Sequence, residues 1–347
     1  MSLRLGFPVK VLGTPGLKSN DTRRWQSNPH LRVSLEYLSA IFDYLQSKSI
    51  SMYRMGSDLA PYASHPDLPQ FHNQVTETRK ELKQIGRRAQ EMDLRLSFHP
   101  SQFIVLNSPD AILREKSTWD LRVQTEILDA MELGPEAVMV IHVGGLYGDT
   151  ASGLDRWCRT WEALPDRVRA RLVLEHDDLR FSAADVLAIH ARTGVRLVFD
   201  LQHFWCLNPE QLELKPTVEK FLATWPRGIR PKIHVSSPRT EMREVQRKDR
   251  KTGKKSTVLQ APVWTGHADF VHPWEFISFF RAIPDLEADV MLEAKTKDLA
   301  LLRLRQDLLR YAPDVAQRFG LSLGVPLAAA PDEVEVDDTQ LADAKYA

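Results

Sequence analysis

Short apolar runs rich in β-branched residues recur along the chain, and segments with helical periodicity separate them. Buried strands that alternate with helices are typical of a parallel sheet with right-handed crossovers. The predicted strands are Leu3–Phe7, Ser51–Met55, Leu94–Phe98, Ala137–Ile141, Arg171–Leu174, Val195–Phe199, Lys232–Val235 and Asp289–Leu292. The predicted helices are Ser34–Ser47, Gln74–Met92, Ser117–Leu133, Asp155–Leu164, Ala183–Thr193, Thr217–Leu222 and Trp274–Ala282.

Eight such strands favour a closed barrel over an open doubly wound sheet. An open sheet usually has a glycine-rich turn after its first strand, whereas the first strand here leads into Gly6-Phe7-Pro8. We therefore predict an α/β fold, a single (β/α)₈ TIM barrel over residues 1–323 with a basic loop insertion at about 239–261.

Composition limits the setting of this domain. The formal net charge of zero neither favours nor excludes a nucleic-acid partner. The 2 cysteines exclude a disulfide scaffold and are typical of a reducing cytoplasm, and no apolar run has the length of a membrane span. Residues 324–347 are acidic and poor in large apolar side chains, which predicts a disordered tail. We expect a cytoplasmic monomer without a membrane partner.

Side chains that can bind metals follow successive predicted strands. In a barrel the carboxyl ends of the strands meet on one face, so these side chains are expected to lie together. Imidazole nitrogens bind Zn²⁺, Mn²⁺ or Fe²⁺, and bridging carboxylates are typical of sites with several metals. The strand-end residues are His99, His142, Glu175, Asp200 with His203 three residues on, His234 and Glu293.

Any one of these residues could instead be a helix cap, a hydrogen-bond donor or half of a buried ion pair. Six strand ends in succession are hard to explain that way, because burying so many ionisable groups is costly without a metal. His30, His72 and His190 lie in polar or helical context and are expected to be structural.

The segments around these strand ends resemble the UV damage endonuclease family, whose relatives include endonuclease IV and the xylose-isomerase-like barrels. The resemblance runs from residue 4 to about residue 310. It is carried in order by RLGF at 4–7, MYRMGSDLAPYASH at 52–65, LSFHPSQF at 96–103, IHVGG at 141–145, LEHDD at 174–178, FDLQH at 199–203, KIHVSSP at 232–238, HADF at 267–270 and MLEAKTKD at 291–298.

The resemblance implies a cluster of three metals, usually Mn²⁺. Its ligands would be His99, His142, Glu175, Asp200, His203, His234, His267 and Glu293. Glu175 and Asp200 are the candidates for bridging ligands, and Glu175 is also counted as catalytic. Lys232 matches a family lysine that can be carboxylated, and a free amine there would repel the metals. His65 is expected to contact a phosphate of the substrate or to assist catalysis.

The activity implied by the resemblance is hydrolysis of a DNA strand immediately 5′ to a UV photoproduct. The products are a 3′-hydroxyl and a 5′-phosphate, and no base is removed. The expected partner is UV-damaged double-stranded DNA at the nucleoid, with cyclobutane pyrimidine dimers and 6-4 photoproducts as lesions and abasic sites as a wider possibility.

Gln102 and Phe103 match a Gln-Tyr pair with which the family wedges into the duplex opposite the lesion. Phe103 keeps the flat ring that wedging needs; the alternative is an ordinary anchor between loop and core. Phe7 and Val11 stand where the family tends to have Tyr and Asn, and His176 stands where it commonly has Asn. Phe7 is retained as a candidate lesion contact.

The insertion between Pro238 and Pro262 is strongly basic. From Arg239 to Lys255 it has eight Lys or Arg residues against three acidic ones. It is either a solvated hairpin or mobile loop, with Thr252-Gly253-Lys254 as its turn, or an arm that contacts DNA phosphates. The candidate contacts are Arg239, Arg243, Arg247 and Lys248.

Two other functions are alternatives to the endonuclease. A metal-dependent sugar isomerase or epimerase could use the same barrel, although it has no need for a basic arm. A DNA-damage binding protein without catalysis would be expected to lack a metal ligand, and none is missing. Cleavage of a duplex that contains one pyrimidine dimer would separate the three functions.

Overall fold

Eight parallel strands form a barrel in the computed structural model, which describes residues 2–249 and 252–322. The predicted strands are all present: β1 (Leu5–Pro8), β2 (Met52–Arg54), β3 (Arg95–Ser97), β4 (Met139–His142), β5 (Leu172–Glu175), β6 (Arg196–Asp200), β7 (Lys232–Val235) and β12 (Asp289–Leu292). Their order in the sheet is β3-β2-β1-β12-β7-β6-β5-β4. The predicted fold class is confirmed.

The barrel closes between the two ends of this sheet. Phe98, just after β3, forms a parallel bridge with Met139 of β4. The Phe98 amide donates to the carbonyl of Val138 at 2.9 Å, and the Val140 amide donates to the carbonyl of Phe98 at 3.0 Å. Each strand therefore has a neighbour on both sides, and the strand ends form a ring.

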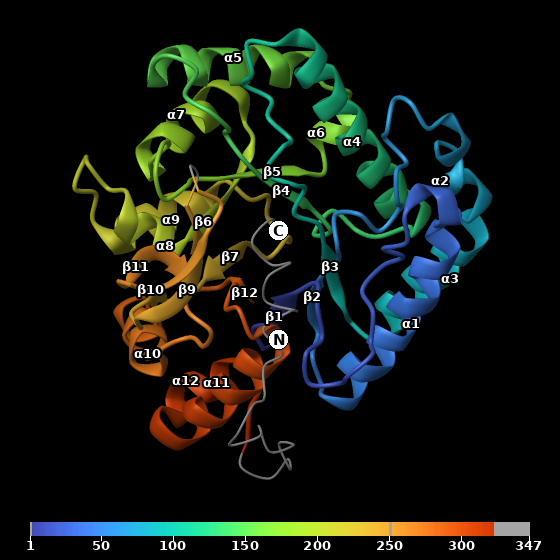
Figure 1. The fold of residues 1–347 in the computed structure, drawn as a ribbon. Helices are drawn as coiled ribbons and strands as arrows, with labels where there is room; N and C mark the ends of the chain where they lie inside the picture. Colours follow the sequence, from blue (N-terminus) through green and yellow to red (C-terminus); the bar gives the residue numbers. More distant parts are fainter. Residues whose placement is uncertain (1, 250–251, 323–347) are drawn as a thin grey trace.

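Helices cover the outside of the barrel (Figure 1). They pack amphipathic faces on the strands; α7, for example, starts with a Ser182–Asp185 capping box and ends at Gly194 with φ 72°. The helices are α1 (Leu31–Ser47), α2 (Gln74–Glu77), α3 (Arg79–Glu91), α4 (Ala111–Ala130), α5 (Thr150–Ala163), α6 (Asp166–Arg169), α7 (Ala183–Thr193), α8 (Leu201–Cys206), α9 (Leu214–Ala223), α10 (Pro273–Ala282), α11 (Lys297–Tyr311) and α12 (Pro313–Arg318), with short 3₁₀ turns at Trp25–Ser27 and Pro69–Phe71.

The helix α11 was not predicted by the periodicity. Its leucines are buried over a wide arc, because it packs against β1 and β12 on one side and against α10 and α12 on another. A helix buried on several sides lacks the single apolar stripe that reveals an amphipathic helix. The sequence therefore hides the helix that follows the eighth strand.

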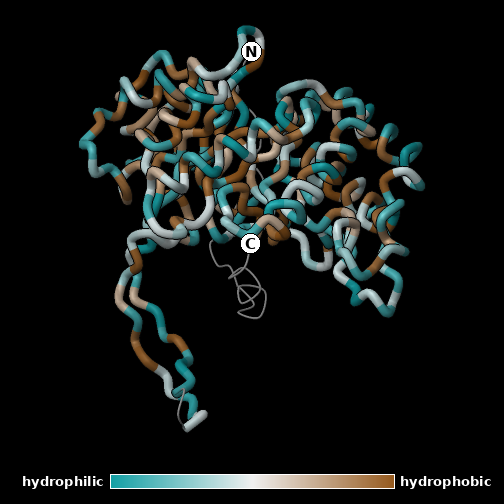
Figure 2. Tube along the Cα trace, turned by 90° about the horizontal axis from the view of Figure 1, so that it is seen from above, coloured by the Kyte–Doolittle hydropathy of each residue, from teal (hydrophilic) through white to brown (hydrophobic). Residues whose placement is uncertain are grey.

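The basic insertion is an antiparallel hairpin of β9 (Arg243–Lys248) and β10 (Lys255–Gln260). The Gly253 amide donates to the Asp249 carbonyl at 2.9 Å, and Gly253 has φ 72°, so the predicted turn is confirmed. Two short strands, β8 (Pro238–Arg239) and β11 (Val263–His267), pair at its base. Figure 2 shows this arm standing clear of the rest of the chain.

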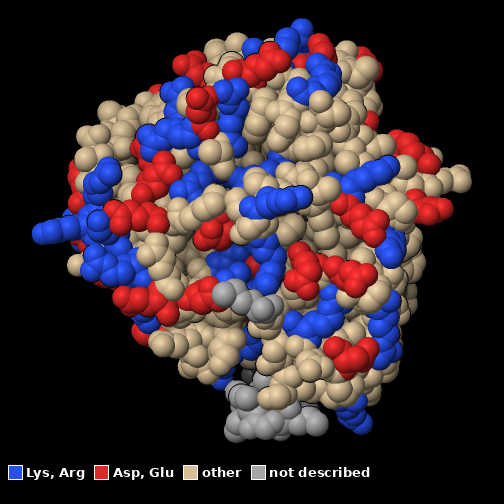
Figure 3. Space-filling view, turned by 180° about the vertical axis from the view of Figure 1, so that it is seen from behind, with Lys and Arg blue, Asp and Glu red and all other residues tan. Residues whose placement is uncertain are grey.

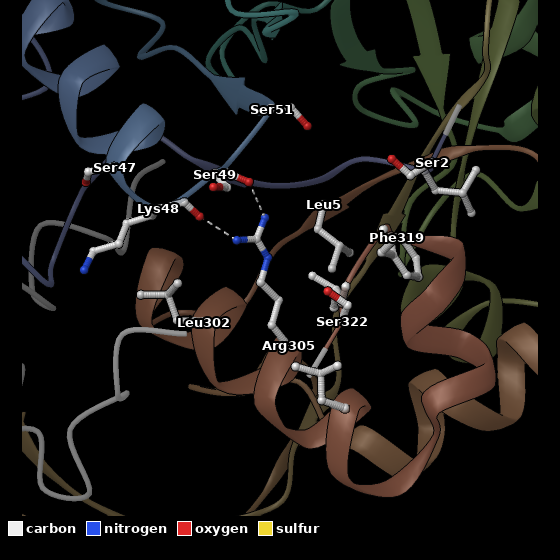
Figure 4. Close-up of a pocket in the computed structure, with 14 residues that line it drawn as sticks. Ser2, Leu5, Ser47, Lys48, Ser49, Ser51, Leu302, Arg305, Phe319 and Ser322 are labelled. Carbon is white, nitrogen blue, oxygen red and sulfur yellow. Dashed lines mark hydrogen bonds between the residues drawn. The ribbon is translucent and has the colours of Figure 1, made fainter. Parts of the chain in front are cut away.

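A cavity of about 350 Å³ lies at the amino end of the barrel, between the start of β1 and the helices α11 and α12 (Figure 4). Arg305 of α11 crosses it and donates to the carbonyls of Lys48 and Ser49 at 2.7 and 2.9 Å. These bonds tie the turn after α1 to the last long helix. We assign this end of the barrel to stability.

The acidic segment 324–347 lies outside the described residues. In the described part no helix is both long enough and apolar enough to cross a membrane.

Candidate metal centre

The carboxyl ends of the strands bring the predicted ligands together. Among the described residues, three groups have ligand atoms that all lie within 4.8 Å of one another. Glu175 belongs to two of the groups and Asp200 also belongs to two, so these carboxylates link the groups into one centre. The groups are His99–His142–Glu175, Glu175–Asp200–His203 and Asp200–His234–Glu293.

Strand register produces this arrangement. His142 at the end of β4 lies opposite Glu175 at the end of β5. Asp200 at the end of β6 lies opposite His234 of β7. Because neighbouring parallel strands project side chains to the same side at paired positions, each pair faces the barrel axis together.

Glu175 occupies the middle of the centre. Its Oε2 lies 3.4 Å from Nε2 of His99 and 3.7 Å from Nε2 of His142. Its Oε1 forms a hydrogen bond of 2.8 Å with Nδ1 of His234 and lies 3.5 Å from Nδ1 of His203. One carboxylate thus faces four imidazoles, as a bridging ligand would.

Burial and charge act in opposite directions on these groups. Burial by itself would raise the pKa of Glu175, but His234 and His142 hold that pKa well below its ordinary value. Burial raises the pKa of Asp200 to about 7 and lowers the pKa of His234 to about 4. His203 is buried too, yet Asp200 and Glu175 raise its pKa to about 9. Such opposed shifts are typical of functional sites.

Several buried atoms of the centre have no hydrogen-bond partner in the described part of the chain. They are Oε2 of Glu175, Oδ2 of Asp200, Nε2 of His234 and Nδ1 of His142. An unpaired buried polar atom costs about 1–3 kcal/mol. Imidazole nitrogens and carboxylate oxygens are ligands of Mn²⁺, Zn²⁺ and Fe²⁺. The donor set therefore fits a cluster of divalent cations.

His176 contacts two of the predicted ligands, Asp200 and His203. Its Nε2 accepts the backbone amide of Asp200 at 3.1 Å, and its carbonyl oxygen lies 3.0 Å from Nδ1 of His203. Burial lowers the pKa of His176 to about 3, so its ring is neutral and can accept this bond. His176 belongs to none of the three ligand groups and supports Asp200 and His203 through these contacts.

Lys232 lies on β7, buried beneath the same ring of side chains. Its Nζ donates to Oγ of Ser97 on β3 at 3.0 Å. Burial, reinforced by the charges of Arg54 and Arg95, holds the pKa of Lys232 well below its ordinary value. The amine is therefore expected to be neutral.

His267 and His65 lie in different surroundings. Nδ1 of His267, on β11, lies 2.8 Å from the carbonyl of Glu293 and 3.9 Å from Oε2 of the same residue. It is beside the centre but in none of the three groups. His65 accepts the amide of Asp67 at 3.2 Å and lines a separate cavity that it shares with Phe103.

The candidate lesion contacts divide into exposed and buried residues. Gln102 is exposed, and Phe103 keeps 66% of its surface exposed, so it is not an anchor between loop and core. Phe7 is 0% exposed and packs edge to face on Tyr53 at 5.5 Å. Its ring has no surface for a nucleotide, so the expectation that Phe7 contacts the lesion is wrong.

The four basic candidates on the arm also differ. Arg239 donates to Oε1 of Gln260 at 3.0 Å, and Arg243 forms ion pairs of 2.5 Å with Glu241 and Asp269. Arg247 and Lys248 are exposed. The face of the molecule in Figure 3 differs from the arm: basic and acidic side chains are interspersed there, and no continuous basic surface is visible.

Three cations beside the centre were missed by the sequence argument. Arg54 at the end of β2 forms an ion pair with Glu293. Lys295 and Lys297, just beyond β12, line a cavity of about 260 Å³ together with Arg54, His267 and Glu293. The rule that strand ends carry the site would have found Arg54, had it been applied to cations as well as to metal ligands.

A family model, a curated relative and a solved structure all relate this chain to UV endonucleases. The model of the family described as UV-endonuclease UvdE matches residues 30–320. A UV DNA damage endonuclease of Bacillus velezensis is 34% identical over 266 residues, which cover 76% of this chain and 77% of that protein. The crystal structure of SacUVDE is similar with a TM-score of 0.73 and 29% identity, over 89% of this chain and 98% of that one.

A D-tagatose 3-epimerase-like protein is similar in fold alone. Its structure has a TM-score of 0.52 and 14% identity, over 82% of this chain and 96% of that one. The barrel by itself therefore does not decide between phosphodiester and sugar chemistry.

Proposed function

Because this chain belongs to the UV-endonuclease UvdE family, we propose that it is a metal-dependent DNA repair endonuclease. It hydrolyses the phosphodiester bond immediately 5′ to a UV photoproduct and leaves a 3′-hydroxyl and a 5′-phosphate. Its substrates are duplexes with cyclobutane pyrimidine dimers or 6-4 photoproducts, and abasic sites are a further substrate to test.

The observation that carries this proposal is the linked set of three ligand groups. Three overlapping groups that share two carboxylates support a trinuclear centre, with Mn²⁺ as the proposed metal. The proposed ligands are His99, His142, Glu175, Asp200, His203, His234, His267 and Glu293. Divalent metals held there would activate a water molecule and neutralise charge on the phosphate oxygens.

The protein's own contribution is to fix this geometry before substrate arrives. Glu175 and Asp200 each belong to two of the groups, so they link the three groups. The neutral ring of His234 and the strand register hold the ligand atoms on one face. Such preorganisation avoids rearrangement during the reaction, which is a large part of catalysis by charge stabilisation.

We propose that Lys232 is carboxylated. The neutral amine would attack the carbon of CO₂ and release one proton to solvent, which leaves an anionic carbamate; the positive charges of Arg54 and Arg95, which act on Lys232, would stabilise that anion. A carbamate group that extends from Lys232 toward the metal centre would add an anionic oxygen ligand. A carbamate resonance on adding ¹³C-bicarbonate to the protein, absent in Lys232→Met, would support the modification.

For damage recognition we propose that Gln102 and Phe103 enter the duplex at the lesion. An apolar ring that is 66% exposed is costly to leave in water, and the stacking of a base on it would recover that energy. Arg247 and Lys248 of the arm would contact backbone phosphates. His65 would contact a phosphate from the loop after β2.

The decisive experiment uses an end-labelled duplex with one pyrimidine dimer, an undamaged duplex of the same sequence, and the protein with Mn²⁺. We expect one cut, immediately 5′ to the dimer, in the damaged strand alone. The product should be extended by a DNA polymerase without phosphatase treatment, because its end is a 3′-hydroxyl. Glu175→Gln should abolish cutting and lower the metal content per chain, while circular dichroism stays unchanged.

His272→Ala provides the matched control, because His272 is exposed and its side chain makes no capping bond. It should cut like the parent. Binding of the damaged duplex without cutting would instead favour a damage-binding protein, and activity of Glu175→Gln within about tenfold of the parent would refute the ligand assignment.

A further inference from the structure

The cavity beside the metal centre is lined by more positive than negative side chains. Arg54, Lys295 and Lys297 meet there with a single carboxylate, Glu293. Glu293 is already paired with Arg54. His267 also lines the cavity, with its Nδ1 2.8 Å from the carbonyl oxygen of Glu293.

The carboxylates that act on the two lysines, Glu293 and Asp269, are already paired with Arg54 and Arg243. Neither forms an ion pair or a side-chain hydrogen bond with any residue in the ranges 2–249 and 252–322. Both are only half-buried. Burial, followed by the charges of Arg54 and Lys295, lowers the pKa of Lys297 to about 7, so an anion bound beside its amine would stabilise the charged form.

The backbone holds Lys297 in place at some cost. Lys297 has φ 52°, a left-handed conformation that is unfavourable for a lysine. The next residue, Asp298, is fully buried and accepts the amides of Leu12 and Gly13 at 2.7 and 2.9 Å and the Tyr44 hydroxyl at 2.6 Å. These bonds fix the start of α11 against the loop after β1. Strain of this kind is concentrated at functional sites.

Three cationic side chains around one carboxylate, in a cavity of about 260 Å³, match an oxyanion in size and charge. Since Glu293 lines this cavity and also belongs to the Asp200–His234–Glu293 group, an anion bound here lies next to one at the metal centre. DNA presents neighbouring phosphates in this way along each strand.

We propose that Arg54, Lys295 and Lys297 form a subsite for a backbone phosphate of the cut strand, adjacent to the phosphate at the metal centre. The identity of the anion as a DNA phosphate rests on the proposed function. The subsite holds the strand in register with the metals and does not take part in bond cleavage.

The test measures binding of an undamaged, fluorescently labelled duplex to the full metal-loaded chain by anisotropy at several salt concentrations. Lys297→Met removes the charge but keeps the length of the side chain. We expect about tenfold weaker binding at about 0.1 M salt. The slope of log K against log salt should fall by about 0.9, the value for one lost phosphate contact. Lys297→Arg should restore both.

Lys220→Met is the matched control, since Lys220 is exposed on the outer helix α9. It should bind like the parent. Lys295→Met tests the same subsite if Lys297→Met fails to fold, and metal content is measured for each variant. Parent-like slope and affinity in both lysine variants would overturn the proposal, as would weaker binding that follows only from loss of metal.

This assay does not depend on cutting. If the parent fails to cut a dimer but Lys297→Met still binds with a smaller salt slope than the parent, the endonuclease is refuted and the anion subsite is supported. If the parent cuts the dimer and the lysine variants bind DNA like the parent, the endonuclease is supported and the subsite is refuted.

Discussion

His176 stands in direct contact with two of the proposed ligands, although it belongs to none of the three ligand groups. Its ring accepts the Asp200 amide and its carbonyl faces His203. The resemblance to the UV damage endonuclease family marked this position as a departure, with His in place of the common Asn. The longer ring reaches the backbone of β6 from β5, so the replacement supplies a contact and does not leave a gap.

We predict that His176→Ala weakens metal binding by about tenfold or more, because residues that orient metal ligands have effects of this size. Its loss also leaves the buried Asp200 amide without a partner. Competition with a chelator measures the affinity, and excess Mn²⁺ should recover activity. His190→Ala on α7 is the control, as the His190 ring lies 2.7 Å from the nearby Val195 carbonyl and belongs to none of the ligand groups. Equal chelator resistance in parent and His176→Ala would contradict the supporting role.

We predict that Phe103→Ala lowers cutting of dimer-containing DNA by about tenfold or more, since base stacking on an aromatic ring contributes about 1–3 kcal/mol. Because the ring is 66% exposed, the free energy of unfolding should change by no more than about 0.5 kcal/mol. Phe103→Tyr should cut like the parent. Rates on damaged duplexes and urea unfolding measure the two effects, and a parent-like rate in Phe103→Ala would exclude wedging.

At the scale of elements, the arm formed by β9 and β10 is poorly explained by stability. Its register sets Lys248 directly opposite Lys255, and like charges at paired positions destabilise a hairpin. Both are exposed, as is Arg247. The arm therefore keeps repulsive charges where an anionic partner could reach them.

We predict that replacing Arg247, Lys248 and Lys255 with Gln lowers the salt slope of duplex binding by up to about 2.7, at about 0.9 for each phosphate contact. Thermal stability should not fall, because a like-charge pair is removed. The control replaces Arg79, Lys80 and Arg87, which are exposed on α3. An unchanged slope in the arm variant would mean that the arm does not touch DNA.

The elements also show what the sequence can and cannot predict. Strand positions and the convergence of His142, Glu175 and Asp200 follow from periodicity, because a barrel brings strand ends together whatever the details. Arg54 and the helix α11 were not predicted because their positions depend on contacts between distant parts of the chain. Arg54 forms an ion pair with Glu293, and α11 packs on several sides. Phe7 was expected to contact the lesion because it stands where the family tends to have Tyr, but its ring packs on Tyr53 of the next strand.

On the scale of the whole molecule, one carboxylate joins the amino ends of several strands. Asp289, the first residue of β12, is fully buried. Its carboxylate accepts hydrogen bonds from Nη1 of Arg95 at 2.9 Å and from Nη1 of Arg4 at 3.0 Å, and Nη1 of Arg230 lies 3.4 Å away. Arg95 lies on β3, Arg4 just before β1 and Arg230 just before β7. The network thus holds the barrel closed at the end opposite the metal centre.

Asp289→Asn should destabilise the fold by about 3–5 kcal/mol, since it leaves the buried Arg95 without its counter-charge. Burial alone would raise the pKa of Asp289, but Arg95 and Arg4 lower it. A lowered pKa means that the carboxylate stabilises the fold fully above the pKa of an unfolded aspartate, about 3.9, and less as the pH falls toward the folded value. In urea unfolding, the difference between parent and variant should therefore be constant from about pH 8 to pH 5 and narrow below about pH 4. A difference that stays constant through the acid range would mean that the charge on Asp289 is not what holds this end of the barrel.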